Sequence, residues 1–197
     1  EKMKLFVDAD ISKINPNELK LFSFSDTTTT FSGKIKADIR DLNPNNLSGN
    51  ISLRDLRFNL SEKIFFVKRF DAELSNNNSI NSLKINSDII DLLLVGKYNF
   101  VDIGKDFAWI IKTYIPNFNF KGLKKEGEIP QDNLKFEFPQ NNSDFELSAT
   151  IKNSQPIFDL YSPSIAVSNN SIIYCKLNNR EKFTLNIAAK KINIGNL

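Results

Sequence analysis

The chain has 197 residues, of which 41% are hydrophobic and 25% charged, with a formal net charge of +3. These values are typical of a folded, water-facing chain and exclude a disordered one. There is no histidine and only one cysteine, Cys175, so the commonest general base, an internal disulfide and a thiolate metal site are all excluded. Lysines and arginines are scattered along the polar sides of predicted strands, so we expect no nucleic-acid partner.

The first half of the chain alternates apolar and polar side chains. The clearest run extends from Phe31 to Arg40, where odd positions are apolar or small and even positions are polar. Because successive side chains of a strand point to opposite faces, this alternation predicts a strand with one apolar and one polar face. The same pattern predicts short strands, in chain order, within 3–11, 31–39, 47–53, 56–60, 65–67, 70–74, 83–85 and 92–100.

A sequence repeat lies within this half. Residues 9–19 align with residues 37–47, and Ala, Asp, Ile, Asn, Pro, Asn and Leu coincide. Asparagine suits a helix N-cap and proline the first helical position, so each copy predicts a strand followed by a single helical turn. Repeats of this size favour a stacked architecture.

An amphipathic helix is predicted over residues 102–115, with Asp102 as the N-cap and Pro116 as the stop. Its apolar face consists of side chains at helical spacing: Ile103, Phe107, Ile110, Ile111 and Tyr114. Further strands are predicted within 134–138, 145–151, 165–167, 173–177 and 183–189. The chain therefore divides into a repeat-bearing β segment (1–116), a loop or linker (117–133) and a continuing β segment (134–197).

Together these elements predict a mainly β fold, a curled antiparallel sheet of repeated short strands with one helix near 102–115. Two arrangements fit the alternation: a closed β-sandwich, or a curled sheet whose apolar face is an open groove. Each methylene group that is kept from water contributes about 0.8 kcal/mol of favourable free energy. An open apolar groove would therefore suit acyl chains. The candidate groove-lining residues are Ile35, Ile39, Ile51, Leu53, Phe58, Leu60, Leu92 and Leu94.

Catalytic motifs are absent from the sequence. The carboxylate pair Asp8 and Asp10 and the pair Asp38 and Asp41 lie at polar strand or turn positions that the alternation already explains. There is no Gly-x-Ser-x-Gly elbow and no glycine-rich phosphate loop. We therefore expect no enzyme, no cofactor and no metal.

Several strand motifs resemble those of the AsmA/TamB family of bacterial envelope proteins, in particular TamB-like translocation and assembly module proteins of the Asn- and Lys-rich Bacteroidetes type. These motifs are FSGKIKADI at 31–39, LSGNISL at 47–53, INSDI at 85–89 and VGKYNF at 95–100. The strand at 145–151, which leads to LYSP at 160–163, fits the same pattern.

The resemblance implies a hydrophobic groove of the β-taco type in the periplasm. It implies phospholipid transport between the inner and outer membranes, outer-membrane protein assembly or protein secretion, and an Omp85-type outer-membrane barrel as a possible partner. It also implies that the chain is a fragment of a longer protein, anchored in the inner membrane by a segment outside this chain. The alternative is a β-sandwich adhesin or a carbohydrate- or ligand-binding module, which predicts a filled core.

Overall fold

The computed structural model describes most of the predicted β regions. The described residues are 3–15, 30–43, 45–60, 63–100, 102–104, 106–107, 143–153, 155, 165–178 and 182–194. The predicted loop at 117–133 and the predicted strand at 134–138 lie outside them.

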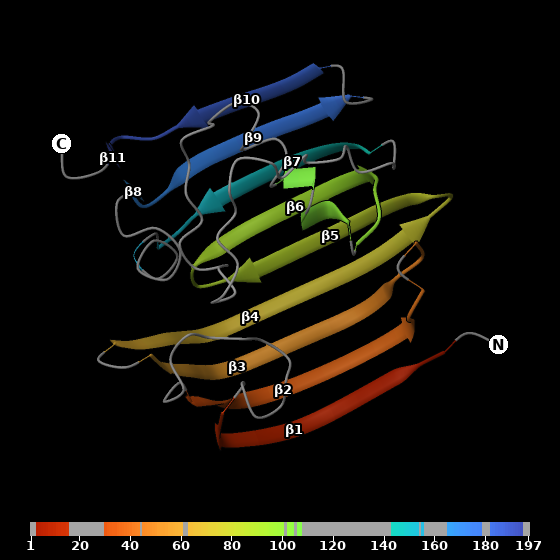
Figure 1. Ribbon diagram of the computed structural model, residues 1–197, viewed down its shortest axis with the longest axis vertical. Helices are drawn as coiled ribbons and strands as arrows, with labels where there is room; N and C mark the ends of the chain where they lie inside the picture. Colours follow the sequence, from red (N-terminus) through yellow and green to blue (C-terminus); the bar gives the residue numbers. More distant parts are fainter. Residues whose placement is uncertain are drawn as a thin grey trace, which may run out of the picture.

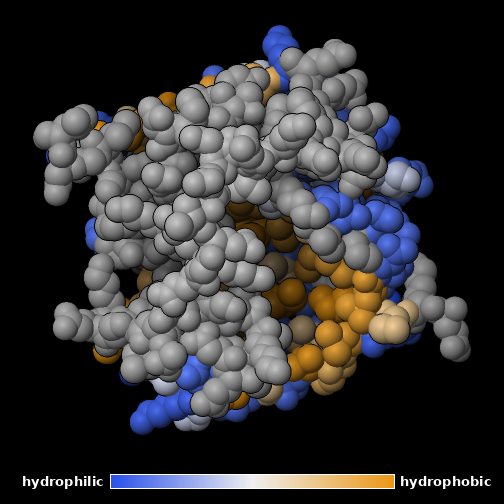
Figure 2. All heavy atoms as spheres, in the orientation of Figure 1, coloured by the Kyte–Doolittle hydropathy of each residue, from blue (hydrophilic) through white to orange (hydrophobic). Residues whose placement is uncertain are grey.

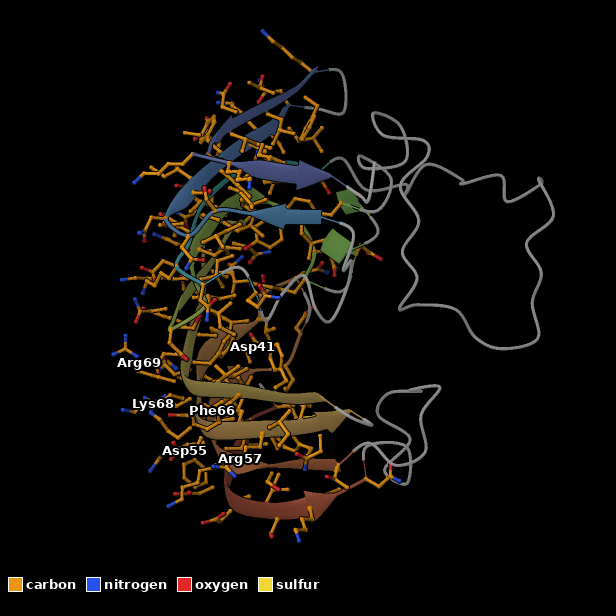
Figure 3. All side chains as sticks on the ribbon, turned by 90° about the vertical axis from the view of Figure 1, so that its left-hand side faces the viewer. Asp41, Asp55, Arg57, Phe66, Lys68 and Arg69 are labelled. Carbon is orange, nitrogen blue, oxygen red and sulfur yellow. The ribbon has the colours of Figure 1, made fainter. Side chains whose placement is uncertain are left out.

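One antiparallel sheet of nine strands dominates the fold, in the order β1-β2-β3-β4-β5-β6-β7-β9-β10 (Figure 1). Its strands are β1 (Leu5–Ile14), β2 (Thr30–Asp41), β3 (Ser48–Leu60), β4 (Lys63–Asn77), β5 (Ile80–Ser87), β6 (Ile90–Lys97), β7 (Asp144–Ile151), β9 (Ser171–Asn178) and β10 (Lys182–Ala188). The two-stranded sheet pairs β8 (Ile165–Val167) with β11 (Ile192–Ile194). The large sheet is open, with β1 and β10 at its ends, and it curves toward one side (Figure 3). The predicted mainly β, curled antiparallel architecture is confirmed.

Several strands are longer than the sequence pattern predicts. The runs at 47–53 and 56–60 belong to one strand, β3, and those at 65–67 and 70–74 to another, β4. At Asp55, which has a φ of 51°, the apolar side chains of β3 switch from odd to even positions. Leu53 pairs with Phe70, and Leu56 pairs with Val67. β3 and β4 therefore keep one register while both change parity at the same level, so the apolar side chains stay on the same face beyond it. Between β2 and β3 this level is a bulge, where Ser32 pairs with Arg57 and Lys34 with Arg54.

Tight turns fix the register between neighbouring strands. Asn78 and Ser79 link β4 to β5, and both have positive φ values (49° and 66°), as a type I′ turn requires. In the second copy of the repeat, the Asn43 side chain accepts a hydrogen bond from the Asn45 amide at 3.0 Å, and the Asn46 amide donates to the Asn43 carbonyl at 2.8 Å. A capped, hydrogen-bonded turn is thus present after β2, but Asn45 and Asn46 form a turn and a bend and not the predicted helical turn. The corresponding turn of the first copy lies outside the described residues.

Glycines within the strands allow close approach of neighbouring backbones. A Cβ atom at Gly49 would lie 2.2 Å from the Asp38 carbonyl oxygen, and one at Gly96 would lie 2.1 Å from the Asp144 carbonyl oxygen. Their φ values, 150° and 155°, also fall in a region that L-residues rarely adopt. Glycine is therefore required at these two positions by the sheet itself.

The predicted helix begins where expected. Ile103, Gly104, Asp106 and Phe107 are helical, and the Asp106 amide donates to the Asp102 carbonyl at 3.0 Å. The rest of the prediction, including Ile110, Ile111 and Tyr114, lies outside the described residues.

Candidate apolar groove

One face of the large sheet, here called the concave face, carries continuous rows of apolar side chains. The strand register aligns one row across seven strands, comprising Ile51, Ala72, Ile85, Leu92, Ala149, Ile173 and Ile187. An adjacent row comprises Ile39, Gly49, Leu74, Leu83, Leu94, Leu147, Cys175 and Leu185. Figure 2 shows apolar residues gathered in a hollowed part of the surface. The opposite face is here called the convex face.

The structure brings the candidate lining residues together on the concave face. Those whose side chains are described are Ile35, Ile39, Ile51, Leu53, Phe58, Leu92 and Leu94. The Leu60 side chain lies outside the described set. Ile39 and Leu94 are buried, whereas the other five are partly exposed. The candidate set therefore includes buried positions as well as positions that are open to solvent.

The part of the concave face on β6, β7 and β9 is filled by the protein itself. Phe145 is 1% exposed and Leu94 is 2% exposed. Tyr98 and Phe107 pack on them, since the Phe107 ring centroid lies 5.2 Å from that of Phe145 and Tyr98 stands edge-on to Phe145 at 6.5 Å. The predicted helix-face residues Ile103 and Phe107 thus contact the sheet and fill this part of the groove.

The part of the concave face on β2 to β4 is less covered. Leu56 and Val67 are buried beside Ile89, but Leu53 and Phe58 around them remain partly exposed. An aromatic row lies along the strand ends here, with ring centroids 4.9 Å apart for Phe31–Phe58 and 6.0 Å apart for Phe58–Phe65. We call this row, consisting of Phe31, Phe58 and Phe65, the aromatic rim.

The opposite strand ends carry amides instead. Asn76 donates to the Asn81 side chain at 2.7 Å, Asn81 donates to the Tyr98 carbonyl at 2.5 Å, and Asn99 donates to the Asn45 side chain at 2.7 Å. Asn76 also donates to the Asn45 carbonyl at 3.2 Å, which ties the β2–β3 turn to β4. This set, Asn45, Asn76, Asn81 and Asn99, is here called the amide rim. The groove therefore has one apolar side and one polar side.

The convex face is mostly charged and forms cross-strand ion pairs. Arg54 lies 2.7 Å from Asp71, whose other oxygen is 3.9 Å from the Arg69 Nε. Partial burial alone raises the pKa of Asp71, but hydrogen bonds from Ser52 and Arg54 outweigh it and hold the pKa below its usual value. A shallow depression of about 350 Å³ lies here between Ser52, Asp71 and Lys84. Its polar groups are engaged in structural pairs such as Ser52–Asp71 at 2.7 Å, so we assign it no ligand.

A buried hydrogen-bonded pair and a buried thiol lie among the apolar side chains. The Ser143 hydroxyl donates to Asp106 at 2.5 Å, and both residues are buried. This contact fastens the helical turn to the start of β7. Burial raises the pKa of the Cys175 thiol to about 11, which removes the thiolate that nucleophilic or metal chemistry would need. Neither feature points to catalysis.

Sequence reasoning missed several residues of the site. Phe31, Phe65 and Phe70 have the same face parity as the candidate residues, and this parity was the signal that could have identified them. The Asn81 side chain, buried where it donates to the Tyr98 carbonyl, has no signal in the sequence, because a polar residue at an inward position contradicts the alternation.

In the described part of the chain, no group of three or more acidic or cysteine side chains could hold a metal ion. No helix there combines the length and apolar character needed to cross a membrane. Comparison with protein-family models, curated proteins and solved structures finds no match for this chain.

Proposed function

We propose that this chain is a non-enzymatic segment of a cell-envelope protein whose concave face binds phospholipid acyl chains. The observation that carries the proposal is the partly exposed apolar floor on β2 to β4 of an open sheet, which includes Ile35, Ile51 and Leu53. Sheltering an acyl chain of some sixteen carbons from water would contribute on the order of 12 kcal/mol. Such a chain needs a continuous apolar surface and few polar contacts, as these rows provide.

The proposal extends to the setting that the sequence motifs imply. The segment would act in the periplasm, where it would carry phospholipid between the inner and outer membranes or assist an Omp85-type barrel in assembling outer-membrane proteins. An anchor in the inner membrane would be supplied by a segment outside this chain. Support for this setting comes from the TamB-like strand motifs alone.

Adjacent residues on opposite faces provide a direct test. Ile51 lies on the concave face, whereas Ser52 lies on the convex face and donates to Asp71. A photoreactive benzophenone side chain at position 51 should crosslink to phospholipid in cells, and the same group at position 52 should not. Equal labelling at both positions would show that the groove does not select acyl chains.

A charge substitution tests the same surface without crosslinking. Ile51→Arg should abolish lipid co-purification detected by native mass spectrometry, because a guanidinium group on the floor opposes acyl-chain binding. Ser52→Arg is the matched variant and should retain lipid. If the wild-type protein carries no lipid and instead binds a glycan or a protein receptor, the adhesin or binding-module alternative is favoured.

A further inference from the structure

The end of the β3–β4 hairpin is apolar on both faces. On its concave face lie Phe58 and Phe65 of the aromatic rim. On its convex face lie Ile64, which is 73% exposed, and Phe66, which is 43% exposed. The nearby polar side chain Asn59 donates to Thr30 at 2.8 Å, so part of its hydrogen-bonding capacity is used within the sheet. We call Phe58, Ile64, Phe65 and Phe66 the hairpin tip.

Cations follow the hairpin tip along the convex face. The Arg57 guanidinium lies 5.6 Å from the centre of the Phe66 ring, and Lys68 is four residues beyond Ile64, which is about 13 Å along a strand. Figure 3 shows Lys68 and Arg69 extending away from the convex side of the sheet. Among the described residues, neither Arg57 nor Lys68 forms an ion pair.

Three carboxylates, Asp55, Asp71 and Asp88, lie close to these cations. Asp71 forms ion pairs with Arg54 and Arg69, and Asp88 is committed to the backbone. The Asp88 oxygens accept hydrogen bonds from the Lys68 amide at 3.1 Å and from the Arg69 amide at 2.9 Å. Asp55, at the bulge, is exposed. Arg69 is therefore held by Asp71. Arg57 and Lys68, in contrast, are exposed and form no ion pair among the described residues, and these two cations make this part of the surface complementary to negative charge.

From this arrangement, we propose that the hairpin tip docks on an anionic bilayer surface. Ile64 and Phe66 would enter the boundary of the hydrocarbon layer, while Arg57 and Lys68 would meet lipid phosphates. A bilayer offers apolar and anionic layers in this order over a short distance, whereas an acidic protein offers the charge without a continuous apolar layer. The inference does not depend on whether the groove holds acyl chains.

Vesicle co-sedimentation tests this docking with the full chain. Phosphatidylcholine vesicles that also contain phosphatidylglycerol should bind the protein, and pure phosphatidylcholine vesicles should bind it much more weakly. Replacing Arg57 and Lys68 by Gln should weaken binding by about fivefold per cation removed. The matched control replaces the exposed Lys190 and Lys191 by Gln and should change binding little.

The apolar contribution needs its own variants. Ile64→Ser combined with Phe66→Ser should lower binding by about tenfold or more, because apolar side chains would no longer be removed from water. Ile172→Ser is the matched control, since Ile172 is 51% exposed on the convex face of β9, far from the tip in the strand order.

A site-specific probe decides the question even if the double variant fails to fold. An environment-sensitive fluorophore on Ile64→Cys should shift to the blue with anionic vesicles, and the same label on Ile172→Cys should not. The native Cys175 is 3% exposed and should escape labelling. An unshifted label at position 64, or binding that is indifferent to phosphatidylglycerol, overturns the proposal. So does a dimer in sedimentation velocity that the tip variants abolish while vesicles remain unbound, because the tip would then contact a second copy.

Discussion

The substitution Gly96→Ala tests how closely β6 and β7 approach each other. The added Cβ would lie 2.1 Å from the Asp144 carbonyl oxygen and 2.5 Å from the Phe145 Cα, both of which are backbone atoms. Relief of this clash requires the strands to separate by about 1 Å, which weakens their ladder hydrogen bonds by about 0.5–1.5 kcal/mol each. The φ of 155° adds about 1–3 kcal/mol of strain for an L-residue. We therefore expect the free energy of unfolding to fall by about 2–4 kcal/mol.

Urea unfolding monitored by circular dichroism measures this loss as a lower midpoint at unchanged slope. Gly104→Ala is the control, because a Cβ there meets no heavy atom within 4 Å and the residue is helical. That control should leave the midpoint unchanged or raise it, since alanine is favoured over glycine in a helix by up to about 1 kcal/mol. If Gly96→Ala costs less than about 0.5 kcal/mol, the close approach of these two strands is wrong.

Three further predictions concern buried or paired groups. Cys175, with its pKa raised to about 11, should resist thiol reagents at pH 8 until urea exposes it; comparable modification rates in folded and unfolded protein would contradict its burial. Because the pKa of Asp71 is lowered by folding, its stabilisation should be present above about pH 4 and disappear as the pH falls through the folded value. Urea midpoints of wild type should therefore drop more on acidification than those of Asp71→Asn, and parallel drops would refute this. Asp88→Ala should lose about 1–3 kcal/mol in the same assay, because two backbone amides of β4 lose their acceptor, whereas Asp10→Ala should lose less than about 1 kcal/mol with its exposed pair.

The alternation of side chains was sufficient to predict the class of fold and which face of each strand is apolar. It could not predict the lengths of β3 and β4, because the change of parity at Asp55 looks like a strand end. The stretch between Leu53 and Leu56 also contains an aspartate, a residue type that favours turns. Continuity becomes evident only once β3 is paired with β4, because the matching change of parity lies in the partner strand.

The strand order was also only partly predictable. Neighbours in the sequence pair from β1 to β7, as expected for short connections. The next strand in sequence, β8, does not join the large sheet but pairs with β11, and β9 takes the place beside β7. Nothing in the three residues of β8 distinguishes them from a sheet strand, since local alternation does not identify a strand's partner.

The alternation of side chains does not determine how much of the groove is filled by the protein itself. Ile51 and Ala149 occupy the same row of the concave face, and both have the inward parity that the sequence shows. Ala149 is 4% exposed within the cluster against which Ile103 and Phe107 pack, while Ile51 remains partly exposed. The difference arises from what packs above each residue, which depends on distant parts of the chain. For this reason the proposal of a bound acyl chain is tested at Ile51 and not in the cluster around Ala149, where Tyr98, Phe100 and Phe107 already pack.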